Sequence, residues 1–104
     1  RAGWVGDYAD PQNFLFLGLS DNSVSNYSRY KNPAYDALLA KTDATIDQAA
    51  RMKLLSEAEG MIMKDEPIIP LIYRSSLHLV SPKVTGYEDN VQNVHRSRYI
   101  SIAP

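Results

Sequence analysis

The sequence predicts a mixed α and β fold, of the α+β kind, in which helices come first and strands follow. Two motifs that start helices, Asp10-Pro11 and Asn32-Pro33, lie in the first third of the chain. Apolar residues then recur at helical spacing as far as Glu66-Pro67. After that point the pattern changes to apolar runs and short alternating segments, which are typical of strands.

Three helices are expected before Pro67. The first begins at Asp10, which acts as the N-cap, and its apolar side is expected to contain Phe14, Leu15, Leu17 and Leu19. The second follows Asn32-Pro33, with residues at i, i+3, i+4 and i+7 facing the core, namely Tyr35, Leu38, Leu39 and Thr42. Asp47 is expected to cap the third and longest helix, whose buried stripe is Met52, Leu55, Ala58 and Ile62.

The remaining segments are predicted to be strands and loops. Residues 1–8, with Trp4 at the centre, are expected to form a strand, and so are residues 68–73, 77–80 and 98–102. Pro70 lacks a backbone donor, so the 68–73 strand must lie at a sheet edge or contain a bulge. The Ser- and Asn-rich segment 20–31 has no apolar periodicity and is predicted to be a loop, like the polar segment 84–93.

Length and composition limit the possible functions. The 104 residues suffice for one small domain, and 44% of them are hydrophobic, as a packed fold requires. The net charge is -1, and the Lys and Arg residues are scattered, so nucleic acid is not an expected partner. There is no cysteine, which excludes disulfides and thiolate metal sites. The chain lacks an initiating Met and Arg1 leads directly into an expected strand, so we expect a fragment.

The opening stretch RAGWVGDYADP contains the strongest candidates for a binding site. It spaces Arg1, Trp4, Asp7 and Asp10 three residues apart. Two close carboxylates can serve acid/base catalysis, hold a metal, or bind a cation. Asp10 already has a role as helix cap, whereas nothing local requires a charge at Asp7. A carboxylate beside a tryptophan is a plausible cation socket, although these residues alone leave the alternatives open.

No catalytic set, cofactor or metal site is predicted. His78 lies in an expected apolar strand and His95 in a polar tail, far apart in sequence, and a lone histidine is more often structural than a ligand. A hydrolase that uses Asp7 and a histidine lacks a nucleophile, because no G-x-S-x-G elbow occurs. The sequence therefore does not predict an enzyme.

Several motifs, taken in order, resemble the C-terminal part of the family 5 extracellular solute-binding proteins. They are W-V-G-D-Y-A-D-P, L-S-D-N, Y-K-N-P-A-Y-D-A-L-L, D-E-P-I-I-P-L-I-Y and L-V-S-P-K-V-T-G-Y. This family comprises the periplasmic oligopeptide- and dipeptide-binding receptors of ABC importers. The resemblance implies a two-lobed periplasmic-binding-protein fold of class II, which closes about a hinge on a peptide.

The resemblance also implies roles for three residues. In the oligopeptide-binding branch, the position of Asp7 accepts the α-ammonium group of the peptide, and Trp4 lies at the same cleft. Arg1 matches an arginine that can meet the carboxylate of short peptides. The sequence R-A-G-W is closer to this branch than to dipeptide, nickel or haem receptors, while murein-peptide receptors share much of the pattern.

The family implies an arrangement of domains and partners as well. Residues 1–74 would belong to the C-terminal lobe, and residues 75–104 would cross a hinge near Ser75-Ser76 and return strands to the N-terminal lobe. The expected partners are short peptides and the membrane permease subunits of an ABC transporter. The expected location is the periplasm, or the cell exterior as a membrane-tethered protein in bacteria without an outer membrane.

Two further expectations follow from this assignment. Without the sheet that residues 77–104 would join, exposed strand edges favour self-association of the isolated chain. The same fold also occurs as the ligand-sensing domain of transcriptional regulators, which remains an alternative to a transport receptor, and other ligands of the family remain possible too.

Overall fold

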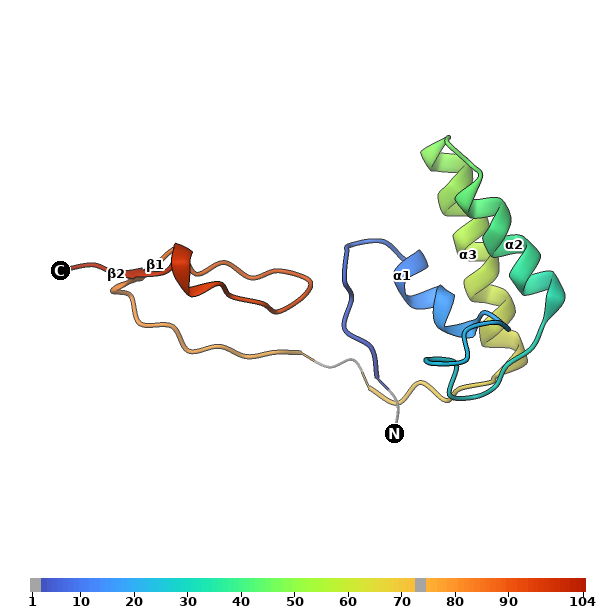
Figure 1. The fold of residues 1–104 in the computed structure, drawn as a ribbon, viewed down its shortest axis with the longest axis horizontal. Helices are drawn as coiled ribbons and strands as arrows, with labels where there is room; N and C mark the ends of the chain where they lie inside the picture. Colours follow the sequence, from blue (N-terminus) through green and yellow to red (C-terminus); the bar gives the residue numbers. More distant parts are fainter. Residues whose placement is uncertain (1–2, 73–74) are drawn as a thin grey trace.

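The computed structural model describes residues 3–72 and 75–104. Figure 1 shows a helical part, formed by the first two thirds of the chain, and a long tail that extends away from it. The radius of gyration is 17.8 Å and the extents are 58 × 35 × 21 Å. A compact chain of this length would have a radius of gyration of about 13 Å. The helical part therefore contains the packed core, and the tail adds length without adding to it.

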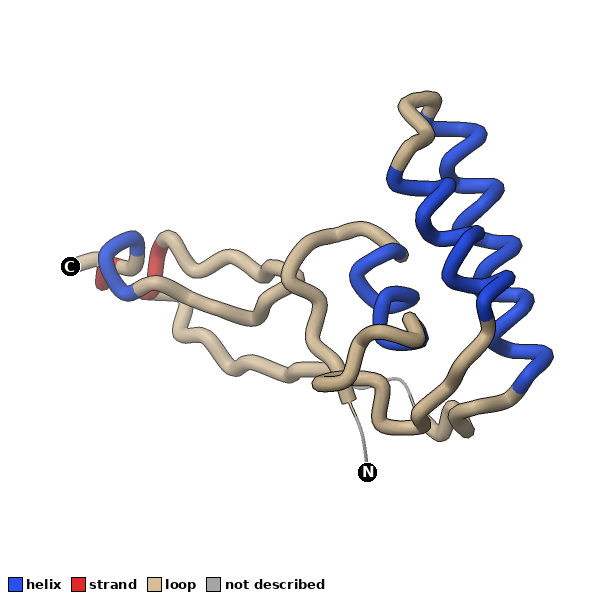
Figure 2. Tube along the Cα trace, turned by 45° about the vertical axis from the view of Figure 1, so that its right-hand side comes forward, coloured by secondary structure: helices blue, strands red, loops and turns tan. Residues whose placement is uncertain are grey.

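Helices α2 (Pro33–Asp43) and α3 (Gln48–Asp65) form an antiparallel hairpin (Figures 1 and 2). The Asn32 side chain accepts hydrogen bonds from the backbone N–H groups of Ala34 and Tyr35, at 3.0 and 3.3 Å. The Asp47 carboxylate accepts one from the N–H of Ala50 at 2.7 Å. Both predicted caps are confirmed. Glu66, with φ 48°, ends α3 in the left-handed conformation, as helix C-termini often do.

The first predicted helix is short. Helix α1 (Gln12–Leu15) continues into one 3₁₀ turn, η1 (Phe16–Gly18). The Asp10 carboxylate accepts a hydrogen bond from the N–H of Gln12 at 2.8 Å, so it caps the first turn as predicted, although Pro11 is the residue that flanks the helix. Of the four apolar residues predicted to line this helix, Leu15 is buried, while Phe14 is half exposed.

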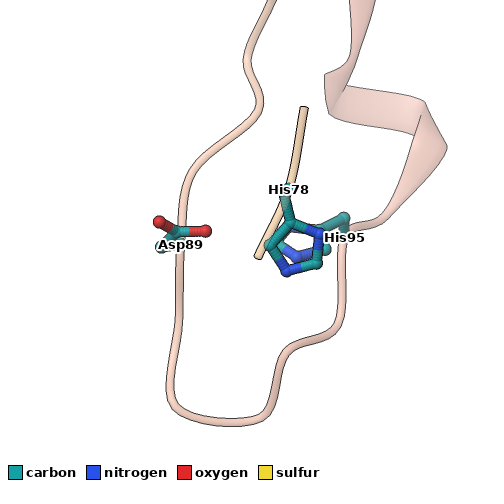
Figure 3. A group of neighbouring side chains, drawn as sticks. All are labelled: His78, Asp89 and His95. Carbon is teal, nitrogen blue, oxygen red and sulfur yellow. The ribbon is translucent and has the colours of Figure 1, made fainter. Parts of the chain in front are cut away.

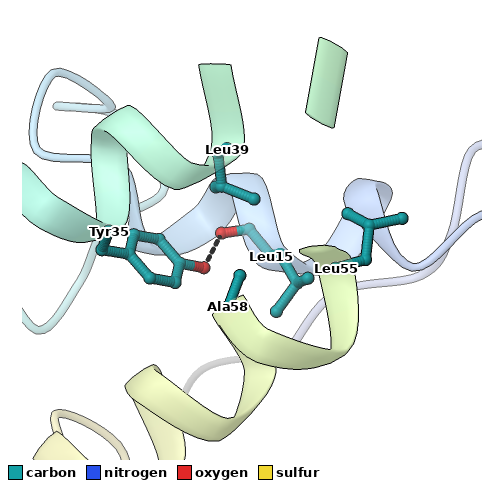
Figure 4. Packing of buried hydrophobic residues seen from close by; sticks show 5 residues of the cluster. All are labelled: Leu15, Tyr35, Leu39, Leu55 and Ala58. Carbon is teal, nitrogen blue, oxygen red and sulfur yellow. Dashed lines mark hydrogen bonds between the residues drawn. The ribbon is translucent and has the colours of Figure 1, made fainter. Parts of the chain in front are cut away.

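The core lies where α1, α2 and α3 meet. Its five buried apolar residues are Leu15, Tyr35, Leu39, Leu55 and Ala58 (Figure 4). The Tyr35 hydroxyl donates a hydrogen bond to the backbone carbonyl of Leu15 at 2.6 Å, which satisfies its only buried polar group. Burial raises the pKa of this hydroxyl, so it remains a neutral donor. The prediction for α2 is confirmed, since Tyr35, Leu39 and Thr42 are buried.

One position of the predicted stripe on α3 is wrong. Leu55 and Ala58 are buried and Ile62 packs against the core, but the side chain of Met52 is 41% exposed. The face that turns inward contains Arg51, Leu55, Ala58 and Ile62, a spacing of i, i+4, i+7 and i+11. Arg51 takes the position expected for Met52 because an acidic partner, Asp10, lies opposite it.

Gly18 permits the close approach of η1 to the helical hairpin. A Cβ atom at this position would lie 2.7 Å from Cδ1 of Ile62 and 3.1 Å from Cε1 of Tyr35. A side chain there would therefore require the Ile62 side chain and the Tyr35 ring to shift.

The loop prediction for residues 20–31 is confirmed, and two asparagines organise this loop. The Asn26 amide nitrogen donates to the carbonyls of Leu19 and Tyr30, at 3.1 and 2.8 Å, and its oxygen accepts from the N–H of Tyr30. Asn22 similarly bonds the carbonyl of Phe16 and the N–H of Ser25. The Tyr30 ring meets Tyr35 edge-to-face at 5.5 Å.

The strand predictions are mostly wrong for the described residues. The sheet consists of two short antiparallel strands, β1 (Val84–Thr85) and β2 (Ser101–Ile102), which pair Val84 with Ile102 and Thr85 with Ser101. A 3₁₀ turn, η2 (Ser97–Tyr99), precedes β2, so only the end of the predicted strand 98–102 is a strand. Val84 and Thr85 were expected in a loop.

The segments 68–72 and 77–80 are not strands, although their sequences are apolar. Leu71, Leu77 and Leu79 have exposed fractions of 84%, 94% and 106%. A strand requires hydrogen-bonding neighbours and an apolar face to cover, and neither segment has them among the described residues. Residues 3–8 are likewise irregular, because the backbone N–H of Asp7 bonds to a side chain instead of a neighbouring strand.

Among the helices in the described part of the chain, none combines the length and the apolar character that a membrane span requires.

A single ion pair among the described residues ties the N-terminal segment to α3. Arg51 Nη1 and Nη2 donate to the two carboxylate oxygens of Asp10, at 2.6 and 3.0 Å. This bidentate geometry is the strong form of an arginine–carboxylate pair. The hydrogen bond from Arg51 holds the pKa of the Asp10 carboxyl below its ordinary value of 3.8.

We predict that Arg51→Gln raises the pKa of Asp10 toward 3.8 and weakens the acid dependence of stability. A carboxyl whose pKa is lower in the folded state stabilises the fold above the unfolded-state pKa and loses this contribution as the pH falls through the folded-state value. The variant should therefore be less stable than the wild type at about pH 7 and approach it in strong acid. Denaturant unfolding at a series of pH values measures this. Lys53→Gln, at an exposed position on α3, is the matched control. An unchanged difference between wild type and Arg51→Gln across the acid range would contradict the prediction.

Candidate ligand-binding site

A buried amide in α1 positions the predicted site residues. Asn13 is 3% exposed, and its side-chain oxygen accepts two hydrogen bonds. One comes from the indole N–H of Trp4 at 3.1 Å and the other from the backbone N–H of Asp7 at 2.8 Å. An amide oxygen has two lone pairs, so this arrangement uses its full capacity. Asn13 thus fixes the position of Trp4 relative to Asp7.

Trp4 is held on one side and open on the other. Its ring meets Phe16 edge-to-face, with centroids 5.3 Å apart and an angle of 73° between the ring planes. Its exposed fraction is 37%. Gly6 is buried beneath Phe14, whose Cζ lies only 3.2 Å from where a Cβ would be. The segment that carries Trp4 therefore packs closely on α1 and η1 while leaving part of the indole accessible.

The carboxylate of Asp7 is available to a ligand. Its backbone is held on both sides, because the N–H bonds to Asn13 and the carbonyl accepts a hydrogen bond from Gln92 Nε2 at 3.0 Å. Its side chain is exposed, and within residues 3–72 and 75–104 no hydrogen bond or ion pair reaches the carboxylate oxygens. A fixed backbone with a free carboxylate is the arrangement that a cation socket requires.

Asp7 borders a cavity of about 620 Å³ that also reaches the tail. The charged or titratable residues that line it are Asp7, Glu88, Asp89, His95 and Arg96. Three carboxylates face one guanidinium, so the cavity favours a cationic group. Trp4 does not line this cavity. Among the described residues, Trp4 and Asp7 are linked because both donate a hydrogen bond to Asn13.

The sequence suggested Asp7 and Asp10 as a pair of acids, and the structure separates their roles. Both oxygens of Asp10 bind Arg51, and one also caps α1. Its lowered pKa keeps it ionised, which does not suit a general acid. Asp10 is a structural residue, so the two acids do not form a catalytic pair. The other candidate, Arg1, lies outside the described residues.

Two features of the site could not be read from the sequence. In the sequence, Asn13 looks like any other polar residue in the first turn of a helix. Only its burial in the structure reveals its role. The contact between Asp7 and Gln92 joins residues 85 positions apart, which no local pattern can predict. His78 and His95, which the sequence analysis treated as unrelated, also lie together, with ring centroids 5.2 Å apart.

No model of a known protein family matches the chain. Several individual proteins do match the chain. The periplasmic oligopeptide-binding protein OppA of Escherichia coli is 41% identical over 103 residues, covering 96% of this chain. The periplasmic murein peptide-binding protein MppA of the same organism is 39% identical over 103 residues, covering 98% of this chain. The chain belongs to the family 5 solute-binding proteins.

The fold supports this family membership. A solved structure of MppA, a periplasmic murein tripeptide-binding protein in its unliganded open form, matches 95% of this chain with a TM-score of 0.73 and 38% identity. The chain spans only 19% of the length of OppA and MppA. Heme-binding protein A of Haemophilus influenzae is also similar, at 37% identity over 87 residues. Ligands therefore differ among the relatives of this family 5 chain.

We predict that Asn13→Ala destabilises the fold by about 1–3 kcal/mol, because the N–H groups of Trp4 and Asp7 both lose their acceptor. Trp4 is the only tryptophan of the chain, so its fluorescence reports this change directly, and its emission should shift to the red. Asn13→Asp retains an acceptor oxygen and is expected to restore the emission of the wild type. Gln48→Ala, at an exposed position, controls for the loss of an amide. Identical emission and stability in wild type and Asn13→Ala would show that Asn13 does not hold the segment.

Proposed function

We propose that this chain is part of a peptide receptor of an ABC importer, in which Asp7 binds the free N-terminus of a short peptide. The observation that carries the proposal is the exposed carboxylate of Asp7, which pairs with none of the described residues, on a backbone held by Asn13 and Gln92. Relatives of similar sequence are named as binding proteins for oligopeptides and murein peptides, which supports a peptide as the ligand.

The physical basis is charge. A peptide N-terminus is an ammonium cation, and an ionic hydrogen bond to a carboxylate contributes about 1.5–3 kcal/mol net. The surplus of acidic groups around the cavity supports a cation at this position. A ligand without the amine would leave a desolvated carboxylate unpaired, so the socket would select free N-termini. Trp4 would supply apolar contact beside this charge, and Arg1 would meet the carboxylate of a short peptide.

We propose further that residues 1–74 lie in one lobe of the receptor and residues 75–104 pass to the other. The helical part has its own core, whereas the segment after α3 extends away from it (Figure 1), and both features are compatible with a crossover near Ser75-Ser76. Lobe closure would then exclude water and strengthen the contact with Asp7. The receptor would deliver its ligand in the periplasm to the permease subunits and would perform no catalysis.

The decisive experiment is a calorimetric titration of the natural full-length protein with a tripeptide and its N-acetylated form. Acetylation and Asp7→Asn should each weaken binding about 10- to 150-fold, which corresponds to one ionic hydrogen bond. The two changes together should lower the affinity little more than either change alone, because they remove the same contact. Glu57→Gln, which neutralises an exposed carboxylate on α3, should leave the affinity unchanged. Equal affinity for the free and acetylated peptides would exclude Asp7 as the socket.

The same titration discriminates a second ligand class. The similarity to a heme-binding protein makes haem a specific alternative. Saturable binding of haem with no response to either peptide would replace the peptide proposal.

We also propose that the 104-residue chain self-associates through the apolar segments 68–72 and 77–80. Ile69, Leu77 and Leu79 are 81%, 94% and 106% exposed, and exposed extended segments of this kind recruit other chains. Light scattering should give a mass above that of the monomer, and Leu77→Lys with Leu79→Lys should restore the monomer. Ile46→Lys, which replaces a 99% exposed apolar residue in the α2–α3 connection, is the control. A wild-type monomer at every protein concentration would refute self-association.

A further inference from the structure

Three titratable side chains gather into a cluster in the tail, and two of them also line the cavity that Asp7 borders. His78, Asp89 and His95 each offer one donor atom, and these atoms all lie within 4.8 Å of one another. Figure 3 shows that Asp89 and His95 lie on the two arms of one loop and His78 on a separate segment of the tail, with the two imidazole rings beside each other. We propose that this cluster binds a divalent zinc ion.

The donor set suits zinc. Two imidazole nitrogens and one carboxylate oxygen are ligands that zinc binds with bond lengths of about 2.0–2.2 Å. Tetrahedral geometry at these lengths places the donors roughly 3.3–3.5 Å apart. The three donors must therefore approach one another by at most about 1.5 Å. His78 and Asp89 are exposed, so rotation of their side chains can supply this movement without disturbing a core.

The two rings are already oriented by neighbouring groups. The Nε2 atoms of His78 and His95 lie 2.9 and 3.1 Å from the side-chain oxygen of Asn93. The Tyr87 ring stacks on His95, with centroids 4.1 Å apart and planes at 17°, and its hydroxyl lies 3.0 Å from the same Nε2. For both histidines these partners are at Nε2, which leaves Nδ1 without a hydrogen bond to any other described residue.

Zinc binding through the two Nδ1 atoms would fit this arrangement. A ligating imidazole commonly bonds a protein group through its other ring nitrogen, which fixes the orientation of the ring. Asn93 adopts φ 52°, an uncommon backbone conformation for a residue other than glycine, and in this conformation its amide contacts both rings. A neutral hydrogen-bonded cluster would explain the two rings and Asn93, but it gives no role to Asp89. The carboxylate supplies the negative charge that a divalent cation needs.

This inference goes beyond the proposed function, since zinc binding requires neither a peptide nor the carboxylate of Asp7. The two sites are nevertheless neighbours, because Asp89 and His95 line the cavity that Asp7 borders.

The test is a calorimetric titration of the natural full-length protein with zinc chloride, without peptide, after removal of metals by a chelator. Wild type should bind one zinc ion that is lost or weakened at least about tenfold in His78→Gln and in His95→Gln, and weakened in Asp89→Asn. Glu88→Gln, which neutralises the adjacent exposed carboxylate, should bind zinc as the wild type does. Circular dichroism of each variant verifies that the fold is retained.

A second measurement does not depend on variants. In nitrogen-detected NMR of the imidazole rings, zinc should shift the ring signals of His78 and His95, the two histidines of this chain. Failure of the wild type to bind zinc, or a zinc affinity in both histidine variants equal to that of the wild type, would overturn the proposal. Loss of zinc binding in the histidine variants would support the proposal whether or not the protein binds a peptide.

Discussion

The hydrogen bond from the Tyr35 hydroxyl to the carbonyl of Leu15 is the interaction on which the rest of this structure depends. It lies at the centre of the core and joins α1 to α2 with no polar atom of the tyrosine left unsatisfied. Asn13 is two residues earlier in the same short helix, so the position of α1 determines where its amide lies. That amide in turn holds Trp4 and Asp7. A helix of four residues has little stability of its own, and therefore the candidate site is only as rigid as the contact of α1 with the core.

The ion pair between Asp10 and Arg51 supports the same helix from its other end. The carboxylate caps α1 and simultaneously binds α3, so one side chain links the end of the site segment to the helical hairpin. Neutralising either partner would loosen this link. By contrast, the described residues of the tail form no ion pair, and the tail is held by the pairing of β1 with β2, by short-range turns and by side-chain hydrogen bonds. Asp7 is therefore tied to the core through Asn13 and α1. From the tail it receives a single hydrogen bond, donated by Gln92.

The tail of the chain exposes apolar segments. The chain corresponds to about a fifth of the length of OppA and MppA, and apolar segments such as 68–72 and 77–80 are highly exposed in it. Exposed apolar residues of this kind form a surface that favours contact with another surface. The acidic cavity and the histidine cluster both lie along this tail, so any partner that covers it would also change their surroundings.

The sequence by itself determined the helices, their caps and most of the core, because these depend on interactions between residues a few positions apart. Asn32, Asp47 and the spacing of Tyr35, Leu39 and Thr42 are local signals of this kind. The family was also predictable, since motifs retain their order in a resemblance, and the roles of Trp4 and Asp7 in binding stay predictions. Only the tertiary structure decided that Arg51 replaces Met52 on the inner face, that Asn13 is buried, and that Asp10 pairs with Arg51 as well as capping α1. It also brought Gln92 to Asp7 and His78 to His95. Most of the strand predictions were wrong for the same kind of reason. Strand pairing, burial and charge contacts between distant residues depend on partners that a local sequence pattern does not contain.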